Sequence, residues 1–348
     1  GEQYQLVEGI TMAFGHQIVE FQSFHGQCGI FVLHTFPFVV IVEAVSAAVQ
    51  QLGSDSAVEL AIVVDEVCRL FGVFLAELLG AEVLAKRKPR MSTAEVITIY
   101  YLFHLSGFRC FKHFYLFYVQ KHMKNEFPET VSYNRFVELM QSVLMPMTIF
   151  AKTCCLGTCT GISFIDSTPI RVCKNKRIKR NKVFKDVATT GKSTMGWFHG
   201  FKLHIVINDR GEILSFCVTQ ANVDDREPLK NESFLKAVFG KLFGDKGYIS
   251  KELHKLLFVD GIELITNIKN NMKNSLMLLS DKILLRKRSV IETVNDELKN
   301  ICQVEHSRHR SVTNFLSNLI AGIIAYQFLP KKPSIKFEHL NSSQLALY

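Results

Sequence analysis

The chain has 348 residues, of which 48% are hydrophobic and 21% charged. It is therefore long enough for two globular domains and too apolar to be disordered throughout. Its formal net charge is +9, and its nine cysteines are scattered and odd in number. This cysteine usage excludes a small disulfide-stapled fold and favours reduced thiols in a cytoplasmic protein.

The charge is divided sharply along the chain. Residues 1–85 contain ten acidic side chains and one basic one, Arg69, whereas the remainder carries 40 basic and 22 acidic side chains. This excess of basic side chains after residue 85 indicates a polyanionic partner, most commonly nucleic acid. The acidic, apolar leader over 1–85 is predicted to be helical or partly disordered. Its first apolar stretch, 29–42, is too short to span a bilayer and lacks the basic start of a signal peptide, so no membrane association is expected.

Residues 86–155 are predicted to form a small helical region. The basic run 86–90 reads as a linker, and Ser92 precedes Glu95 by three residues, which is typical of a capping box at a helix start. Apolar spacing favours helices over 92–107, 110–121 and 133–143. Such a region is typical of DNA binding, but an inert packing domain is equally compatible, because any solvated helix face carries such charges.

Residues 156–333 are predicted to form an α/β domain with a mixed sheet flanked by helices, followed by a tail over 334–348. Strands are expected at 161–165, 198–207, 212–219, 241–245 and 262–268. Helices are expected at 229–238, 250–259 and 289–302, the first of them capped by Asp224 and Asp225. A further buried helix is expected over 315–329.

Two carboxylates follow strands that are candidates for sheet neighbours, Asp166 and Asp245, and a third, Glu292, lies on a later helix. Side chains at strand ends gather at one edge of a sheet, where ligands commonly bind. Three convergent carboxylates repel one another unless a cation neutralises them, and hard oxygen ligands suit magnesium or manganese. Two such ions can activate an attacking oxygen and stabilise a leaving one in phosphodiester chemistry.

The predicted helix around Glu292 places other polar residues on the same face: Arg288, Asn295, Asp296 and Lys299. One interpretation is a metal-binding carboxylate flanked by two cations that grip phosphates. The other is a solvated helix with ordinary ion pairs. Spacing alone leaves both open.

Several ordered motifs resemble transposases of bacterial insertion sequences. They are FIDST at 164–168, MGWF at 195–198 with GFKLH at 200–204, NVDDR at 222–226, FGDKGY at 243–248, LRKR at 285–288 with IET at 291–293, and EHSRHR at 305–310. The chain is most similar, from about 86 to 333, to the family named for insertion sequence 982. That resemblance implies a ribonuclease H-like domain of the DDE type, which cuts element ends and joins the freed 3′-hydroxyls to target DNA.

By motif position, the resemblance makes Asp166, Asp245 and Glu292 both the catalytic triad and the ligands of two magnesium ions, which manganese can replace. Asp296 is the rival for the third place. The implied partner is double-stranded DNA, as element ends and target, bound by a homodimer in the cytoplasm at the nucleoid. A catalytically silent DNA-binding protein and a structure-specific nuclease of the same fold are the alternatives.

The residues predicted to contact DNA are basic and cluster in a few segments, because counterion release rewards such clusters on phosphates. They are Arg171, Lys174, Lys176, Arg177, Lys179, Arg180, Lys246, Arg288, Lys299, Arg308 and Arg310. A merely solvated loop is the alternative for 171–185. The only tryptophan, Trp197, is expected to be buried under the sheet, with stacking on a displaced base as the alternative. His199 and His204 are expected to be packing residues.

Overall fold

A mixed six-stranded sheet forms the centre of the molecule in the computed structural model, which describes residues 89–268, 276–305, 309–336 and 345–347. The strand order is β2-β3-β1-β5-β6, and β4 pairs with β3 beyond the end of β2. The strands are β1 (Ile162–Cys173), β2 (Thr189–Ser193), β3 (Gly196–Asn208), β4 (Ile213–Gln220), β5 (Gly240–Gly244) and β6 (Ile262–Thr266). Strands β1, β5 and β6 are parallel, and the others are antiparallel to their neighbours.

Strand β1 is the central element, and it is much longer than the predicted strand 161–165. It pairs along its length with β3 and, at its start, with β5. The two long strands approach closely at Gly200, where an added Cβ would lie 2.1 Å from the Ile170 carbonyl oxygen. Only glycine permits this approach, so the pairing that extends β1 toward the basic segment depends on it.

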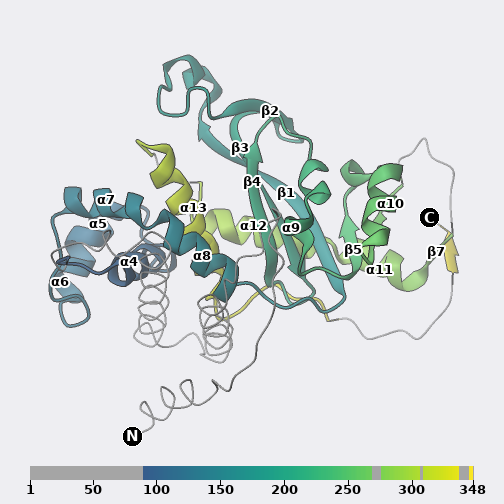
Figure 1. Ribbon diagram of the computed structural model, residues 1–348, viewed down its shortest axis with the longest axis horizontal. Helices are drawn as coiled ribbons and strands as arrows, with labels where there is room; N and C mark the ends of the chain where they lie inside the picture. Colours follow the sequence, from purple (N-terminus) through teal and green to yellow (C-terminus); the bar gives the residue numbers. More distant parts are fainter. Residues whose placement is uncertain (1–88, 269–275, 306–308, 337–344, 348) are drawn as a thin grey trace, which may run out of the picture.

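Successive residues of a strand point to opposite faces of the sheet, and apolar side chains of this sheet are packed on both faces. On one face, Ile165 and Leu242 pack with the short helix α9 (Glu232–Leu235) and with α10 (Lys251–Val259). On the other, Phe164 and Phe243 belong to the larger core, to which α11 (Leu279–Lys287) and α12 (Ser289–Asn300) contribute. Figure 1 shows α12 crossing the sheet while α10 and α11 lie together at one end of the molecule.

The amino-terminal part of the described chain is helical, as predicted. Ser92 caps α4 (Thr93–Leu105) in the expected capping box with Glu95. The remaining elements are α5 (Phe111–His113), the π-helix η2 (Phe114–Val119), α6 (Gln120–His122), α7 (Tyr133–Ser142) and α8 (Leu144–Cys154). These helices pack against α13 (Val312–Gln327), the predicted buried helix, so that one core runs from the helical region into the sheet.

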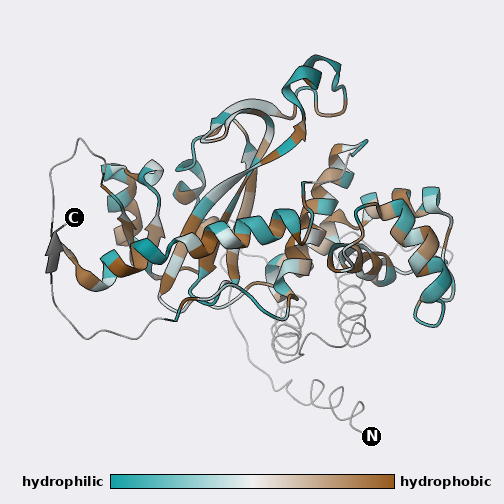
Figure 2. Ribbon diagram, turned by 180° about the vertical axis from the view of Figure 1, so that it is seen from behind, coloured by the Kyte–Doolittle hydropathy of each residue, from teal (hydrophilic) through white to brown (hydrophobic). Residues whose placement is uncertain are grey.

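The segment joining β1 to β2 projects beyond the sheet and contains the 3-10 helix η3 (Asn175–Arg180). Figure 2 colours this helix as hydrophilic. The other short elements are η4 (Glu227–Lys230), η5 (Lys246–Tyr248), β7 (Leu276–Leu278) and β8 (Leu345–Leu347). Within the residues that the structure describes, no helix has the length and apolar character needed to cross a membrane. The predicted leader, 1–85, lies outside the described residues.

One predicted helix is wrong in detail. In place of a continuous helix over 229–238, the chain forms η4 and α9. Asp224 does not begin a helix: its carboxylate accepts hydrogen bonds from the backbone and side chain of Arg226. Asp225 instead forms an ion pair with Lys202. Local bonding of an aspartate to a residue two positions on competes with helix initiation, and here it prevails.

Candidate functional site

The sheet register places Asp166 and Asp245 at corresponding positions. Phe164 of β1 is the register partner of Phe243 of β5, and each aspartate lies two residues beyond its phenylalanine. The two rings stack with their centroids 5.5 Å apart on the face covered by α12. Since residues two apart share a face, both carboxylates are directed to that same face.

Glu292 enters from α12, which packs against β1. Its carboxylate lies 2.7 Å from the Arg288 guanidinium one helical turn earlier, and the same guanidinium lies 4.0 Å from Asp166. Arg288 is largely buried, with 16% of its side chain exposed, whereas 58% of Glu292 is exposed. Arg288 is therefore a cation shared between the strand carboxylate and the helix carboxylate.

Electrostatics link all three acids. The pKa of Asp166 is raised to about 6, chiefly by burial and to a smaller extent by the charges of Glu292 and Asp245, while Arg288 and the Ser167 backbone amide act in the opposite direction. A carboxyl group in this setting binds a proton or a cation more readily than one in water.

Asn295 contacts Asp166 directly and was not singled out as a site residue by the sequence. It lies on α12 three residues after Glu292, is 93% buried, and donates from Nδ2 to the Asp166 carboxylate at 3.0 Å. Its Oδ1 is buried and accepts no hydrogen bond within the described part of the chain. The available signal was its helical spacing from Glu292, but spacing does not indicate which polar residue of a face reaches the strand.

Asp296, the rival of Glu292, is exposed and accepts a hydrogen bond from Asn300, its neighbour one turn along α12. Glu292, by contrast, is among the charges that raise the pKa of Asp166. Glu292 is thus linked to Asp166 through the shared guanidinium of Arg288, whereas the described contact of Asp296 is with Asn300.

The donor set fits a hard divalent cation in its chemistry. Carboxylate oxygens and a neutral amide oxygen are the ligands that such ions prefer, and the unpaired Asn295 Oδ1 adds an amide oxygen beside Asp166. Within the described ranges, no group of three or more His, Cys, Asp or Glu side chains is arranged to hold a metal ion. Cys154, Cys155 and Cys159, which lie close together in the sequence, are free thiols.

The predicted DNA-contacting residues fall into two groups. Six basic residues of the segment after Asp166 are exposed: Arg171, Lys174, Lys176, Arg177, Lys179 and Arg180. Lys246 and Arg310 are exposed as well, and Arg308 lies outside the described residues. Two others are engaged within the protein, Arg288 with the acids and Lys299 with the Pro169 carbonyl and Glu305. Burial lowers the pKa of Lys299, which ties α12 to β1.

Trp197 is not buried, contrary to expectation. It stands near the tip of the β2–β3 hairpin with 62% of its surface exposed, because the hairpin extends past the elements that cover the rest of the sheet. His199 and His204 are buried, and they contact Thr190 and Thr219 respectively. Both are packing residues, as expected.

The fold and site define an α/β domain in which Asp166 lies within β1, Asp245 follows the paired strand β5, and Glu292 lies on a helix that packs against β1. The predicted position of Asp166 at a strand end is therefore wrong, because pairing with β3 extends β1 to Cys173. Residues 156–312 match a family model described as "Transposase DDE domain". The match supports a DDE transposase family, a transposase-type function with DNA as partner, and a ribonuclease H-like form of the α/β fold. Proteins of this family generally use divalent metal ions. No curated protein and no solved structure matches the chain.

Proposed function

We propose that this protein is a DNA transposase of the type named for insertion sequence 982, and that it cuts element ends and joins them to target DNA. The observation that supports the proposal is that Asp166 stands on β1, that Asp245 directly follows the paired strand β5, and that the charges of Asp245 and Glu292 both act on the Asp166 carboxyl. These three residues lie within the segment that matches the DDE domain.

In this proposal Asp166, Asp245 and Glu292 are the catalytic residues and hold two magnesium ions, which manganese can replace. When bound, the metal supplies charge neutralisation and activation of an oxygen nucleophile. Two other residues orient the proposed metal ligands. Asn295 donates a hydrogen bond to one oxygen of Asp166, and the Arg288 guanidinium lies between the carboxylates of Asp166 and Glu292.

DNA would approach along the exposed basic segment that follows β1. Within the described residues, Arg171, Lys174, Lys176, Arg177, Lys179 and Arg180 form no ion pair with an acidic side chain, so their charges are available to phosphates. The segment leaves the sheet at the end of the strand that carries Asp166. We propose that a homodimer holds the two element ends.

The test is strand cleavage and joining on element-end DNA with Mg²⁺. Asp166→Ala and Asp245→Ala are each expected to lower the rate by at least about a hundredfold, because each removes a proposed ligand of the metal ions that would stabilise the transition state. Both variants should keep their DNA affinity, measured by fluorescence anisotropy. Asp260→Ala, an exposed acid at the end of α10, is the control and should cut normally. Cleavage by both variants would overturn the metal assignment.

A catalytically silent DNA-binding protein is the second candidate, favoured by the guanidinium that Arg288 places between two of the acids. Calorimetric titration with Mn²⁺ separates the candidates. A transposase should bind the metal in a manner lost in Asp166→Ala, whereas a silent binder should show no binding that depends on this residue. A nuclease of the same fold would cut DNA without joining a 3′-hydroxyl to the target.

A further inference from the structure

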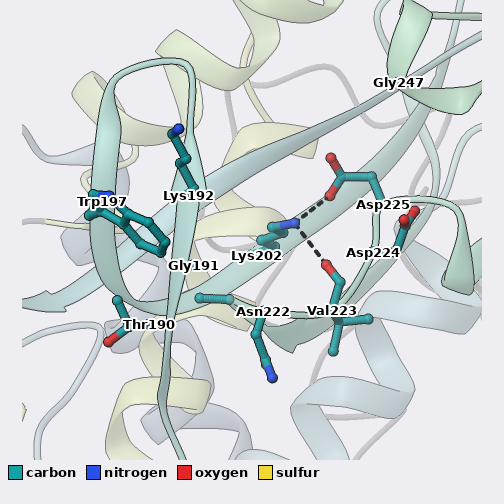
Figure 3. Close-up of a pocket in the computed structure, with 11 residues that line it drawn as sticks. Thr190, Gly191, Lys192, Trp197, Lys202, Asn222, Val223, Asp224, Asp225 and Gly247 are labelled. Carbon is teal, nitrogen blue, oxygen red and sulfur yellow. Dashed lines mark hydrogen bonds and ion pairs between the residues drawn. The ribbon is translucent and has the colours of Figure 1, made fainter.

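A pocket of about 420 Å³ opens beside the acidic centre, between the β2–β3 hairpin and the segment after β4. Figure 3 shows Trp197 and Lys192 on the hairpin side, facing Lys202 and Asp225 on the other. This volume lies in the range of small-ligand sites, and a single nucleotide is a ligand of that size.

The aromatic wall of the pocket is the ring of Trp197. Its register partner across the hairpin is Lys192, whose ammonium lies 5.9 Å from the ring centroid. An indole that is 62% exposed leaves a large flat apolar surface in water. Such a face is suited to stacking on a planar base, and stacking tolerates any base because every base has a π-face.

Among the described residues, the charges of the pocket leave one lysine, Lys192, without an anionic partner; its ammonium lies over the Trp197 ring. Lys202 donates to Asp225 and to the Val223 carbonyl, both at 2.8 Å, and Asp224 is paired with Arg226 at 2.6 Å. Lys192 has neither a hydrogen bond nor an ion pair from its ammonium among the residues that the structure describes. The pocket therefore offers a positive charge next to the aromatic face, the combination that a phosphate and its base require.

The pocket adjoins both parts of the proposed DNA path. Gly247, two residues after Asp245, lines it. The next residue, Tyr248, has its ring beside Gly244, the residue before Asp245: a Cβ added at Gly244 would lie 3.1 Å from that ring. On the other side, Asn175 of the basic segment donates to the Trp197 carbonyl at 2.9 Å.

We propose that this pocket receives one unpaired nucleotide of a DNA strand, with the base stacked on Trp197 and a phosphate at Lys192. The inference rests on the proposed function in that it takes DNA as the partner. It assigns to the hairpin a binding site separate from the acids, which acts on the strand next to the point of cleavage and requires neither metal nor chemistry.

The chain provides its own probe, because Trp197 is its only tryptophan. The full chain carrying Asp166→Ala, in EDTA, is titrated with three duplexes. One is fully paired, one contains a single unpaired thymidine, and one contains an abasic residue in place of that thymidine. The expected result is strong quenching of tryptophan fluorescence by the duplex with the unpaired base only. Equal quenching by the abasic duplex would overturn the proposal, because no base is then needed.

Affinity measurements on variants complete the test. Trp197→Ala should weaken binding of the unpaired-thymidine duplex on the order of tenfold to a hundredfold and leave the paired duplex unchanged. Trp197→Phe, which keeps an aromatic face, should restore most of that affinity. Met195→Ala is the matched control, because Met195 is 81% exposed on the same hairpin and does not line the pocket.

Lys192→Gln should make the dependence of the log binding constant on log salt concentration less steep, by the amount expected for the loss of about one phosphate contact. If Trp197→Ala binds the unpaired-thymidine duplex as tightly as the parent protein does, the pocket assignment is wrong. The result is independent of catalysis. If the acids prove dispensable for cutting but the quenching persists, the metal assignment is overturned and the pocket assignment stands. If cutting depends on the acids but the unpaired base causes no quenching, only the pocket assignment is refuted.

Discussion

At the scale of single residues, the site depends on how one carboxylate is held. Asp166 lies at the centre of β1, and its surroundings combine a hydrogen bond from Asn295, a nearby guanidinium and two further carboxylates. Residues that orient a metal ligand through a hydrogen bond commonly contribute tenfold to hundredfold to metal affinity. Asn295 has this position, and it also presents an unpaired buried oxygen beside the ligand.

Replacing Asn295 with alanine is therefore expected to weaken Mn²⁺ binding by about tenfold or more, because Asp166 loses the bond that fixes its orientation. Calorimetric titration with Mn²⁺ measures the effect. Asn300→Ala is the matched control: it removes the same amide-to-carboxylate bond, to Asp296, from the exposed side of the same helix. Equal Mn²⁺ affinity in the two variants would show that Asn295 does not position the acid.

At the scale of elements, α12 is held in place from both directions. Lys299 ties it to β1 through the Pro169 carbonyl, and His104 of α4 donates from Nδ1 to the carbonyl of Cys302, just beyond the end of the helix. His104 is completely buried, which lowers its pKa to about 4. The imidazole must therefore be neutral for α4 and the end of α12 to pack together.

This burial predicts that acid weakens the protein. The folded-state pKa of His104 is below the unfolded value of 6.5, so the unfolded chain binds more protons and the contribution, present above pH 6.5, is lost as pH falls toward 4. Between pH 7 and pH 5 the loss is about 2 kcal/mol from this residue. Urea unfolding at both pH values should show a smaller difference in His104→Phe, and the full difference in the exposed control His122→Phe.

At the scale of the whole molecule, the helical region and the sheet are not independent. Helix α13 comes after the sheet in sequence, yet it packs against α4, α7 and α8, and the larger core includes residues of all of them. The division predicted near residue 155 follows a change of secondary structure, but hydrophobic packing crosses it. Cooperative unfolding of the two parts is the expected consequence.

Leu319→Ala tests this cooperativity, because Leu319 is fully buried in α13. The substitution should lower the free energy of unfolding by roughly 2–5 kcal/mol, through lost burial and a cavity. Circular dichroism in the far and near ultraviolet should follow one coincident transition. Val259→Ala, at a position 84% exposed, should change little. Two separated transitions in Leu319→Ala would show that the helical region folds alone.

The amino-acid sequence by itself determined the features that depend on neighbours along the chain. The capping box at Ser92, the helices α7 and α10 and the strands β3 to β6 follow local spacing, and each lies within a few residues of its predicted range. The α/β class follows from their order. The acids at 166 and 245 stand out in the sequence because each follows a short apolar run.

Tertiary structure decided what depends on contacts between distant segments. The extension of β1 comes from pairing with β3, and the exposure of Trp197 comes from a hairpin whose tip the described part of the chain leaves uncovered. In the sequence, Asn295 does not differ from the other polar residues of α12. Only the packing of α12 on the sheet places it in contact with Asp166, from which it is 129 positions away in sequence. Helical spacing states which residues share a face, but only the packed sheet determines which of them that face presents to a carboxylate.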